Sequence, residues 1–214
     1  MTGGGGGDRK RGEAGRSGST LEGGGDRKRG EAGRSGSTIR TSGRDGAVVT
    51  PWPTPDIAGP GQESVWAYPR PPRLEEFTGS ITVELGGRTV ASTTRGWRVL
   101  ETSHPPTYYL PAEAFADGVL RRADGSSWCE WKGQATYYDL VSEGRVAPRA
   151  AWTYRQPTRD FVPITGALAV MATAVDRCTV NGEEVTPQPG GFYGGWINSW
   201  IVGPFKGIPG SMGW

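Results

Sequence analysis

Apolar and polar residues alternate in several short stretches from residue 73 onward, the pattern of half-buried β-strands. Ile81, Val83 and Leu85 are separated by polar residues, and Gly86-Gly87 then supplies the positive φ angles of a two-residue hairpin turn. Glu143-Gly144 and Asn181-Gly182 predict two more turns of this kind. Further strands are predicted at residues 89–91, 97–100, 107–110, 127–131, 136–141, 145–146, 150–154, 178–180 and 183–186.

Only residues 111–123 have the features of a helix, which Pro111 would open and Gly118 interrupts. In the strand at 150–154, Ala150, Trp152 and Tyr154 are expected to share one face. Many short antiparallel strands with one short helix predict a mainly β fold, either a small barrel-like domain, a sandwich or a tent.

The chain divides into four segments by composition. Residues 1–50 are rich in glycine and charge, hold no aromatic residue, and contain GGGDRKRGEAGRSGST twice, at 5–20 and 23–38. We expect this arm to be disordered, because it lacks the apolar surface that offsets ordering entropy. Residues 51–72 predict an extended lead-in rich in proline and aromatic residues. Residues 73–189 predict the β domain, and residues 190–214 a glycine- and aromatic-rich C-terminal strap around it.

The net charge of +2 divides unevenly, with 10 basic and 6 acidic residues before residue 47 and 14 and 16 after it. A mildly acidic domain argues against nucleic acid as a partner. No apolar run is long enough to span a membrane and no signal peptide is evident, so we expect a cytoplasmic protein that does not bind membranes. A homo-oligomer formed through the strap is a further hypothesis.

Candidate chemistry gathers in three segments, LETSHPPTYYLP at 100–111, WCEWKG at 128–133 and AAWTY at 150–154. Cys129 is a candidate nucleophile, with His104 as its base and Glu101 orienting the imidazole. The alternative is that Cys129 is a structural thiol. Lys132 and Cys129 face opposite ways on a regular strand, so Lys132 can assist only if Gly133 bends the backbone.

Familiar cofactor motifs are missing. The sequence has no GxxxxGK[ST] loop, no GxGxxG before a helix, no HExxH and no GxSxG. With one histidine and two cysteines, Cys129 and Cys178, a structural zinc site is not expected, and neither is any other cofactor. A single disulfide between the two cysteines stays open.

The order of these segments resembles a known family. ITVELGGRTVASTTRGWRVLETSHPPTYYLP, SSWCEWKGQATYYDL, AAWTY and AVDRC follow one another as in the family catalogued as domain of unknown function 427, sometimes labelled a nucleotidyltransferase. The resemblance runs from about Trp66 to Val185, and the tail GGFYGGWINSWIVGPFKG extends it.

The resemblance implies a β-tent fold, which is also that of the thalidomide-binding domain of cereblon. Those relatives hold a zinc ion with four cysteines, which two cysteines cannot do. It also implies that one pocket gathers Glu101, His104, Cys129, Lys132, Trp152 and Tyr154. The transferase label finds no support in the residues.

The sequence is therefore consistent with three functions. The first is a module that binds or senses an unknown small molecule. Trp152, Tyr154 and Trp131 would form its aromatic walls, and Glu101, His104 and Lys132 would orient the ligand. Tyr109 is a further candidate for ligand binding. The second is a cysteine-dependent transferase or hydrolase. The third is a structural or interaction protein that uses its aromatic tail.

Overall fold

The computed structural model describes residues 52–214. The predicted arm of residues 1–50 lies outside them, as does Pro51 at the start of the expected lead-in. The described part is mainly β, and its larger sheets are antiparallel, as the alternating pattern predicts.

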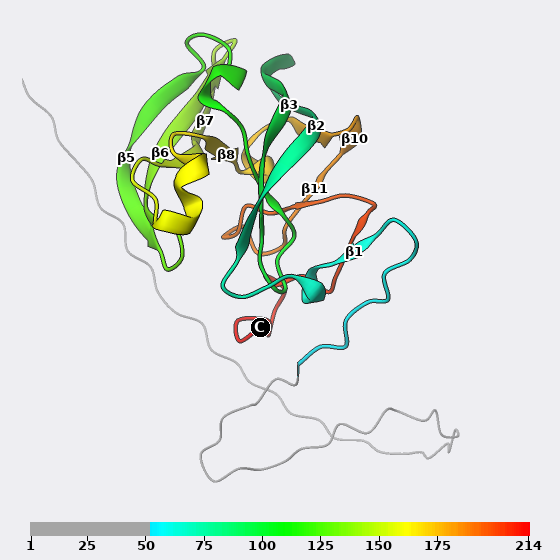
Figure 1. Cartoon of the computed structure of the whole chain (residues 1–214). Coiled ribbons are helices and arrows are strands. Elements are labelled where there is room, and N and C mark those ends of the chain that lie inside the picture. The colour runs from blue at the N-terminus through cyan, green and yellow to red at the C-terminus, as the bar shows by residue number, and fades with distance from the viewer. Residues whose placement is uncertain (1–51) are drawn as a thin grey trace, which may run out of the picture. The chain divides into compact units, whose positions relative to one another are not determined.

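Two antiparallel sheets form most of the domain (Figure 1). The five-stranded sheet has the order β10 (Glu183–Glu184), β9 (Arg177–Val180), β2 (Arg73–Leu85), β3 (Arg88–Leu100) and β4 (Thr107–Tyr109). The four-stranded sheet has the order β5 (Leu120–Cys129), β6 (Gly133–Ser142), β7 (Arg145–Tyr154) and β8 (Leu168–Val170). Leu110 and Leu168 exchange two backbone hydrogen bonds of 2.8 Å, which join β4 to β8 and so connect the two sheets.

The remaining elements are short. β1 (Glu63–Ser64) pairs in parallel with β13 (Ile201–Val202), and β11 (Thr186–Pro187) pairs antiparallel with β12 (Trp196–Ile197). The described residues also contain four 3-10 helices: η1 (Val65–Ala67), η2 (Ala112–Ala114), η3 (Arg159–Ile164) and η4 (Ala172–Ala174). None of the helices within 52–214 is long and apolar enough to cross a membrane.

The structure differs from the prediction at residues 111–123. Only the single turn η2 is helical there, Gly118 has a φ of 76°, and β5 begins at Leu120. Leu120, Arg121 and Arg122 pair with β6. Hydrogen bonding to a neighbouring strand therefore decides the conformation of this segment, against its local helix signal.

The three predicted hairpin turns are confirmed. Gly86 and Gly87 have φ angles of 63° and 73° and connect β2 to β3. Glu143-Gly144 and Asn181-Gly182 also have positive φ at both positions, and they connect β6 to β7 and β9 to β10. Two successive positive φ angles match the twist of the flanking strands, which is why these dipeptides are reliable signals.

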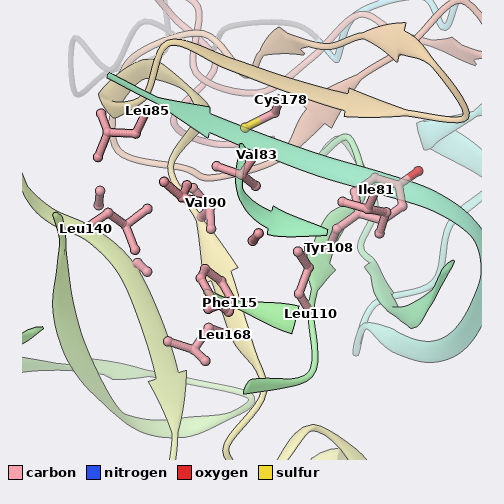
Figure 2. Packing of buried hydrophobic residues seen from close by; sticks show 14 of the residues in the cluster. Ile81, Val83, Leu85, Val90, Tyr108, Leu110, Phe115, Leu140, Leu168 and Cys178 are labelled. Atoms are coloured by element: carbon pink, nitrogen blue, oxygen red, sulfur yellow. The ribbon is translucent and has the colours of Figure 1, made fainter. Parts of the chain in front are cut away.

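The main hydrophobic core draws side chains from both sheets (Figure 2). Ile81, Val83 and Leu85 of β2 are fully buried, as their alternation predicts, and Leu140 of β6 and Leu168 of β8 belong to the same cluster. Full burial of each such side chain contributes about 1.5–3 kcal/mol.

A smaller second cluster contains Tyr154, with Trp152 packed against it. Ala150 was expected on the same face as these two residues, but it belongs to the main core. The pairing of β6 with β7 is irregular between Tyr138 and Leu140, and Arg149 has a φ of 50°. The side chains of β7 therefore do not alternate regularly across this point.

The C-terminal strap, residues 190–214, packs as part of the domain. Trp196 is fully buried in the main core, and its indole Nε1 donates a 3.0 Å hydrogen bond to the carbonyl oxygen of Val170. Phe192, by contrast, is 81% exposed. The strap therefore contributes Trp196 to the hydrophobic core and leaves Phe192 at the surface.

Candidate functional site

A cavity of about 420 Å³ lies beside the second hydrophobic cluster. Its walls come from the end of β3 and the loop to β4, from β4, from the β5–β6 hairpin, from β7 and from the strap. Segments that are far apart in the sequence therefore converge here. The eight residues singled out from the sequence all line it: Glu101, His104, Tyr109, Cys129, Trp131, Lys132, Trp152 and Tyr154.

β4 contributes Tyr109 because neighbouring side chains of a strand point to opposite faces. Tyr108 packs in the main core, whereas Tyr109 joins the second cluster and lines the cavity. The Tyr109 hydroxyl is buried near Trp152 and Tyr154, yet no hydrogen bond of good geometry reaches it from any residue in 52–214. Burial raises the pKa of Tyr109, so this hydroxyl keeps its proton and remains a donor.

The β5–β6 hairpin brings Cys129 and Lys132 to the same cavity. Cys129 is the last residue of β5 and pairs with Gly133, the first residue of β6, and residues 130–132 form the turn. Gly133 has a φ of 89°, a conformation that favours glycine. The bend at Gly133 that the sequence required is therefore present. It turns Lys132 inward, with only 9% of the residue exposed, while Trp128 is 76% exposed.

The ammonium of Lys132 lies among aromatic rings. Its Nζ is 5.9 Å from the ring centroid of Tyr154 and 5.5 Å from that of Phe161. No carboxylate in the described part of the chain forms a salt bridge with it. Cation–π contacts contribute about 0.5–2 kcal/mol, but they do not replace the hydrogen bonds that an ammonium makes in water.

The loop between β3 and β4 presents His104. Its Nδ1 donates a 3.0 Å hydrogen bond to the carbonyl oxygen of Thr102, which leaves Nε2 unprotonated in the neutral ring. Burial lowers the pKa of His104, and the nearby Glu101 carboxylate opposes this effect only in part. The Glu101 carboxylate itself pairs with Arg70 at 3.3 Å. Glu101 therefore does not orient the imidazole by a hydrogen bond, as the enzyme hypothesis expected.

The strap forms the rim of the cavity. The ring of Tyr193 meets that of His104 edge-on at 4.7 Å, and Phe192 packs edge-on against Tyr193 at 5.0 Å. The backbone of Gly194 lies directly on the indole of Trp152. Lys206 donates a 2.7 Å hydrogen bond to the main-chain oxygen of Trp214.

Sequence reasoning missed several lining residues, among them Tyr137, Arg149, Gln188, Phe192, Tyr193 and Lys206. Tyr137 pairs with Trp152 across β6 and β7 only because the register shifts between Tyr138 and Leu140, and the sequence carries no signal for this shift. The strap residues had no signal either, since glycine- and aromatic-rich composition does not indicate which aromatic side chains face inward.

The thiols differ in their surroundings. Cys129 and Cys178 are both free, so the disulfide left open by the sequence is not formed. Cys178 lies in the main core, where burial raises its pKa to about 12. Cys129 is partly exposed at the cavity, without a hydrogen bond to His104 or Lys132. Within residues 52–214, no cluster of three histidine, cysteine or acidic side chains could hold a metal ion.

The model of a family described as a domain of unknown function (DUF427) matches residues 73–181. The chain belongs to this family. The DUF427 match confirms the resemblance seen in the sequence and covers every candidate residue from Glu101 to Tyr154. The strap residues that complete the cavity lie beyond the DUF427 match. A search of curated proteins found no match to the chain.

Proposed function

We propose that this domain binds a small organic molecule in the cavity between β4, β7, the β5–β6 hairpin and the strap. The observation that carries the proposal is the convergence on one cavity of aromatic walls and of Lys132, a cation without a salt bridge in residues 52–214. Its volume of about 420 Å³ is within the range of about 300–1,000 Å³ that is typical of ligand pockets.

The apolar part of a ligand would contact Trp131, Trp152 and Tyr154. Trp131 and Trp152 are partly exposed although they pack against the second cluster, so each has a free surface toward the cavity. At the rim, Trp128 and Phe192 are 76% and 81% exposed. Large aromatic side chains that stay in water around a cavity are a common feature of binding sites, since a bound molecule covers them.

The polar part of a ligand would meet Lys132, which lines the cavity and forms no salt bridge with a carboxylate among residues 52–214. An ammonium with three donors is costly to remove from water without hydrogen-bond partners. A ligand that accepts hydrogen bonds from Lys132 would supply them. Tyr109 would contribute its ring, because its hydroxyl is buried beside Trp152 and Tyr154.

Replacing Trp152 with alanine is expected to weaken ligand binding by about tenfold, because it removes one aromatic wall. The measurement is a thermal-shift screen of wild type against a library of small organic compounds, followed by titration of each hit against the variant. Trp97→Ala is the matched control, since Trp97 packs against the same cluster but does not line the cavity. Hits that bind Trp152→Ala and wild type equally well would place the binding site elsewhere.

A cysteine-dependent enzyme is the second candidate, favoured by the partly exposed Cys129 and the neutral His104 beside one cavity. Alkylation by iodoacetamide, followed by mass spectrometry across a range of pH, distinguishes the two. Cys178 is expected to stay unmodified in the folded protein, because it is buried and its pKa is raised to about 12. Alkylation of Cys129 at the rate of free cysteine supports the binding module. Reaction much faster than free cysteine at neutral pH would favour the enzyme.

The expectations about localisation and further partners rest on the sequence alone. We propose a cytoplasmic protein that binds neither nucleic acid nor membranes. An oligomer formed through the strap would have to use its exposed side chains, such as Phe192 and Met212, because Trp196 is already buried within the domain.

A further inference from the structure

Within residues 52–214, Lys132 forms no salt bridge with a carboxylate. A buried ammonium is normally paired with a carboxylate, since the loss of hydration is costly for an isolated ion. Of the two acidic residues that line the cavity, Glu101 pairs with Arg70 and Glu130 is exposed on the hairpin turn. Neither forms a salt bridge with Lys132. The electrostatics of the cavity therefore favour an anion from outside the domain.

Aromatic rings surround this ammonium. Lys132 Nζ is 5.9 Å from the Tyr154 centroid and 5.5 Å from that of Phe161, and the Tyr109 and Tyr154 centroids are 6.3 Å apart. The Tyr109 hydroxyl is itself buried beside Trp152 and Tyr154, so the ammonium is the donor that a ligand can reach. An ammonium forms a charge-assisted hydrogen bond with a monoanionic carboxylate.

The other cations around the cavity already have partners. Arg149 stacks on Tyr137 at 4.0 Å and donates a 3.2 Å hydrogen bond to the carbonyl of Asp124. Lys206 bonds to Trp214, and His104 is neutral. These contacts occupy donors of Arg149 and Lys206 without cancelling their charges. Within residues 52–214, Lys132 is the lining cation whose ammonium makes no hydrogen bond, and one free ammonium matches one carboxylate.

We propose that the cavity binds a small aromatic carboxylic acid as its anion. Lys132 holds the carboxylate, and Trp131, Trp152 and Tyr154 pack against the planar body. This inference rests on the proposed binding function and gives it a ligand class. No covalent step is involved.

The test uses defined probes: benzoate, cinnamate and phenylacetate, each paired with its neutral primary amide and titrated by calorimetry at neutral pH. Wild type is expected to bind at least one acid about tenfold more tightly than the matching amide, since charge-assisted hydrogen bonds are stronger than neutral ones. Lys132→Met is expected to abolish that preference. Arg177→Met removes an equal charge from a residue that does not line the cavity and is expected to keep the preference.

The outcomes separate the two proposals. If amides bind as tightly as acids, and Trp152→Ala weakens both, the carboxylate assignment is overturned while the binding cavity stands. If none of the acids binds, the assignment also falls, whatever the compound screen finds. Tighter binding of phenyl phosphate than of benzoate would overturn the preference for a single charge.

The stability of Lys132→Met without ligand gives an independent readout. We expect this variant to unfold at the same or a higher urea concentration than wild type, because it replaces an unpaired buried charge with an apolar side chain of similar length. A clear loss of stability would show that Lys132 is a structural group and would overturn the inference.

Discussion

Replacing Trp196 with alanine is expected to destabilise the domain by about 3–5 kcal/mol, as for other large aromatic side chains in cores. Trp196 is fully buried, and its ring lies 5.4 Å from that of Tyr108. Alanine would leave a cavity and would also remove the hydrogen bond from Nε1 to the carbonyl of Val170. Urea denaturation followed by circular dichroism measures the change.

The matched control is Trp128→Ala. Trp128 is 76% exposed, so its loss is expected to change the free energy of unfolding by no more than about 0.5 kcal/mol. If Trp196→Ala proved as stable as Trp128→Ala, the strap would be an appendage and not part of the core. Truncation after Gly190 is expected to agree with Trp196→Ala, because it removes the same buried side chain together with β12 and β13.

Replacing Gly194 with alanine is expected to cost about 1–3 kcal/mol and to weaken ligand binding at the cavity. A Cβ atom there would overlap the Trp152 indole, with two further ring atoms at 3.0 and 3.1 Å. An indole is rigid and cannot bend away as the end of a long side chain can. Either the strap or the wall of the cavity must therefore move.

Gly213→Ala is the control for this prediction, since Gly213 lies in the same strap with nothing within 4 Å of an added Cβ atom. Both variants are compared by urea denaturation and by titration with a ligand found in the compound screen. Equal stability and equal affinity of the two variants would mean that the strap does not support Trp152.

The sequence predicted some features of the candidate site and not others. The family resemblance implied one pocket for six residues of the segments at 100–111, 128–133 and 150–154, and all six line the cavity together with the candidates Tyr109 and Trp131. A resemblance reports a spatial grouping that local patterns do not. The expected hydrogen bond between the Glu101 carboxylate and the His104 imidazole is not formed, although the His104 amide donates to the Glu101 carbonyl. Arg70, which is distant in sequence from the motif, takes the Glu101 carboxylate instead.

Lys132 illustrates how a turn changes the outcome of strand alternation. Regular alternation would have placed it opposite Cys129. Instead β5 ends at Cys129, and Gly133 adopts a φ of 89°, so that both side chains line the same cavity. From the sequence, this arrangement required a bend at Gly133, and only the structure shows that the bend is present.

The sequence by itself determined the mainly β fold and the three hairpin turns, because alternation and positive-φ dipeptides act over a few residues. Only the tertiary structure decided that residues 120–122 form a strand, that Ala150 joins the main core, and that the strap buries Trp196 while exposing Phe192. Each of these outcomes depends on contacts between segments far apart in the chain or on shifts in strand register. Only the tertiary structure could likewise show that Lys132 lacks a carboxylate partner among residues 52–214, because this depends on which side chains the fold places around it.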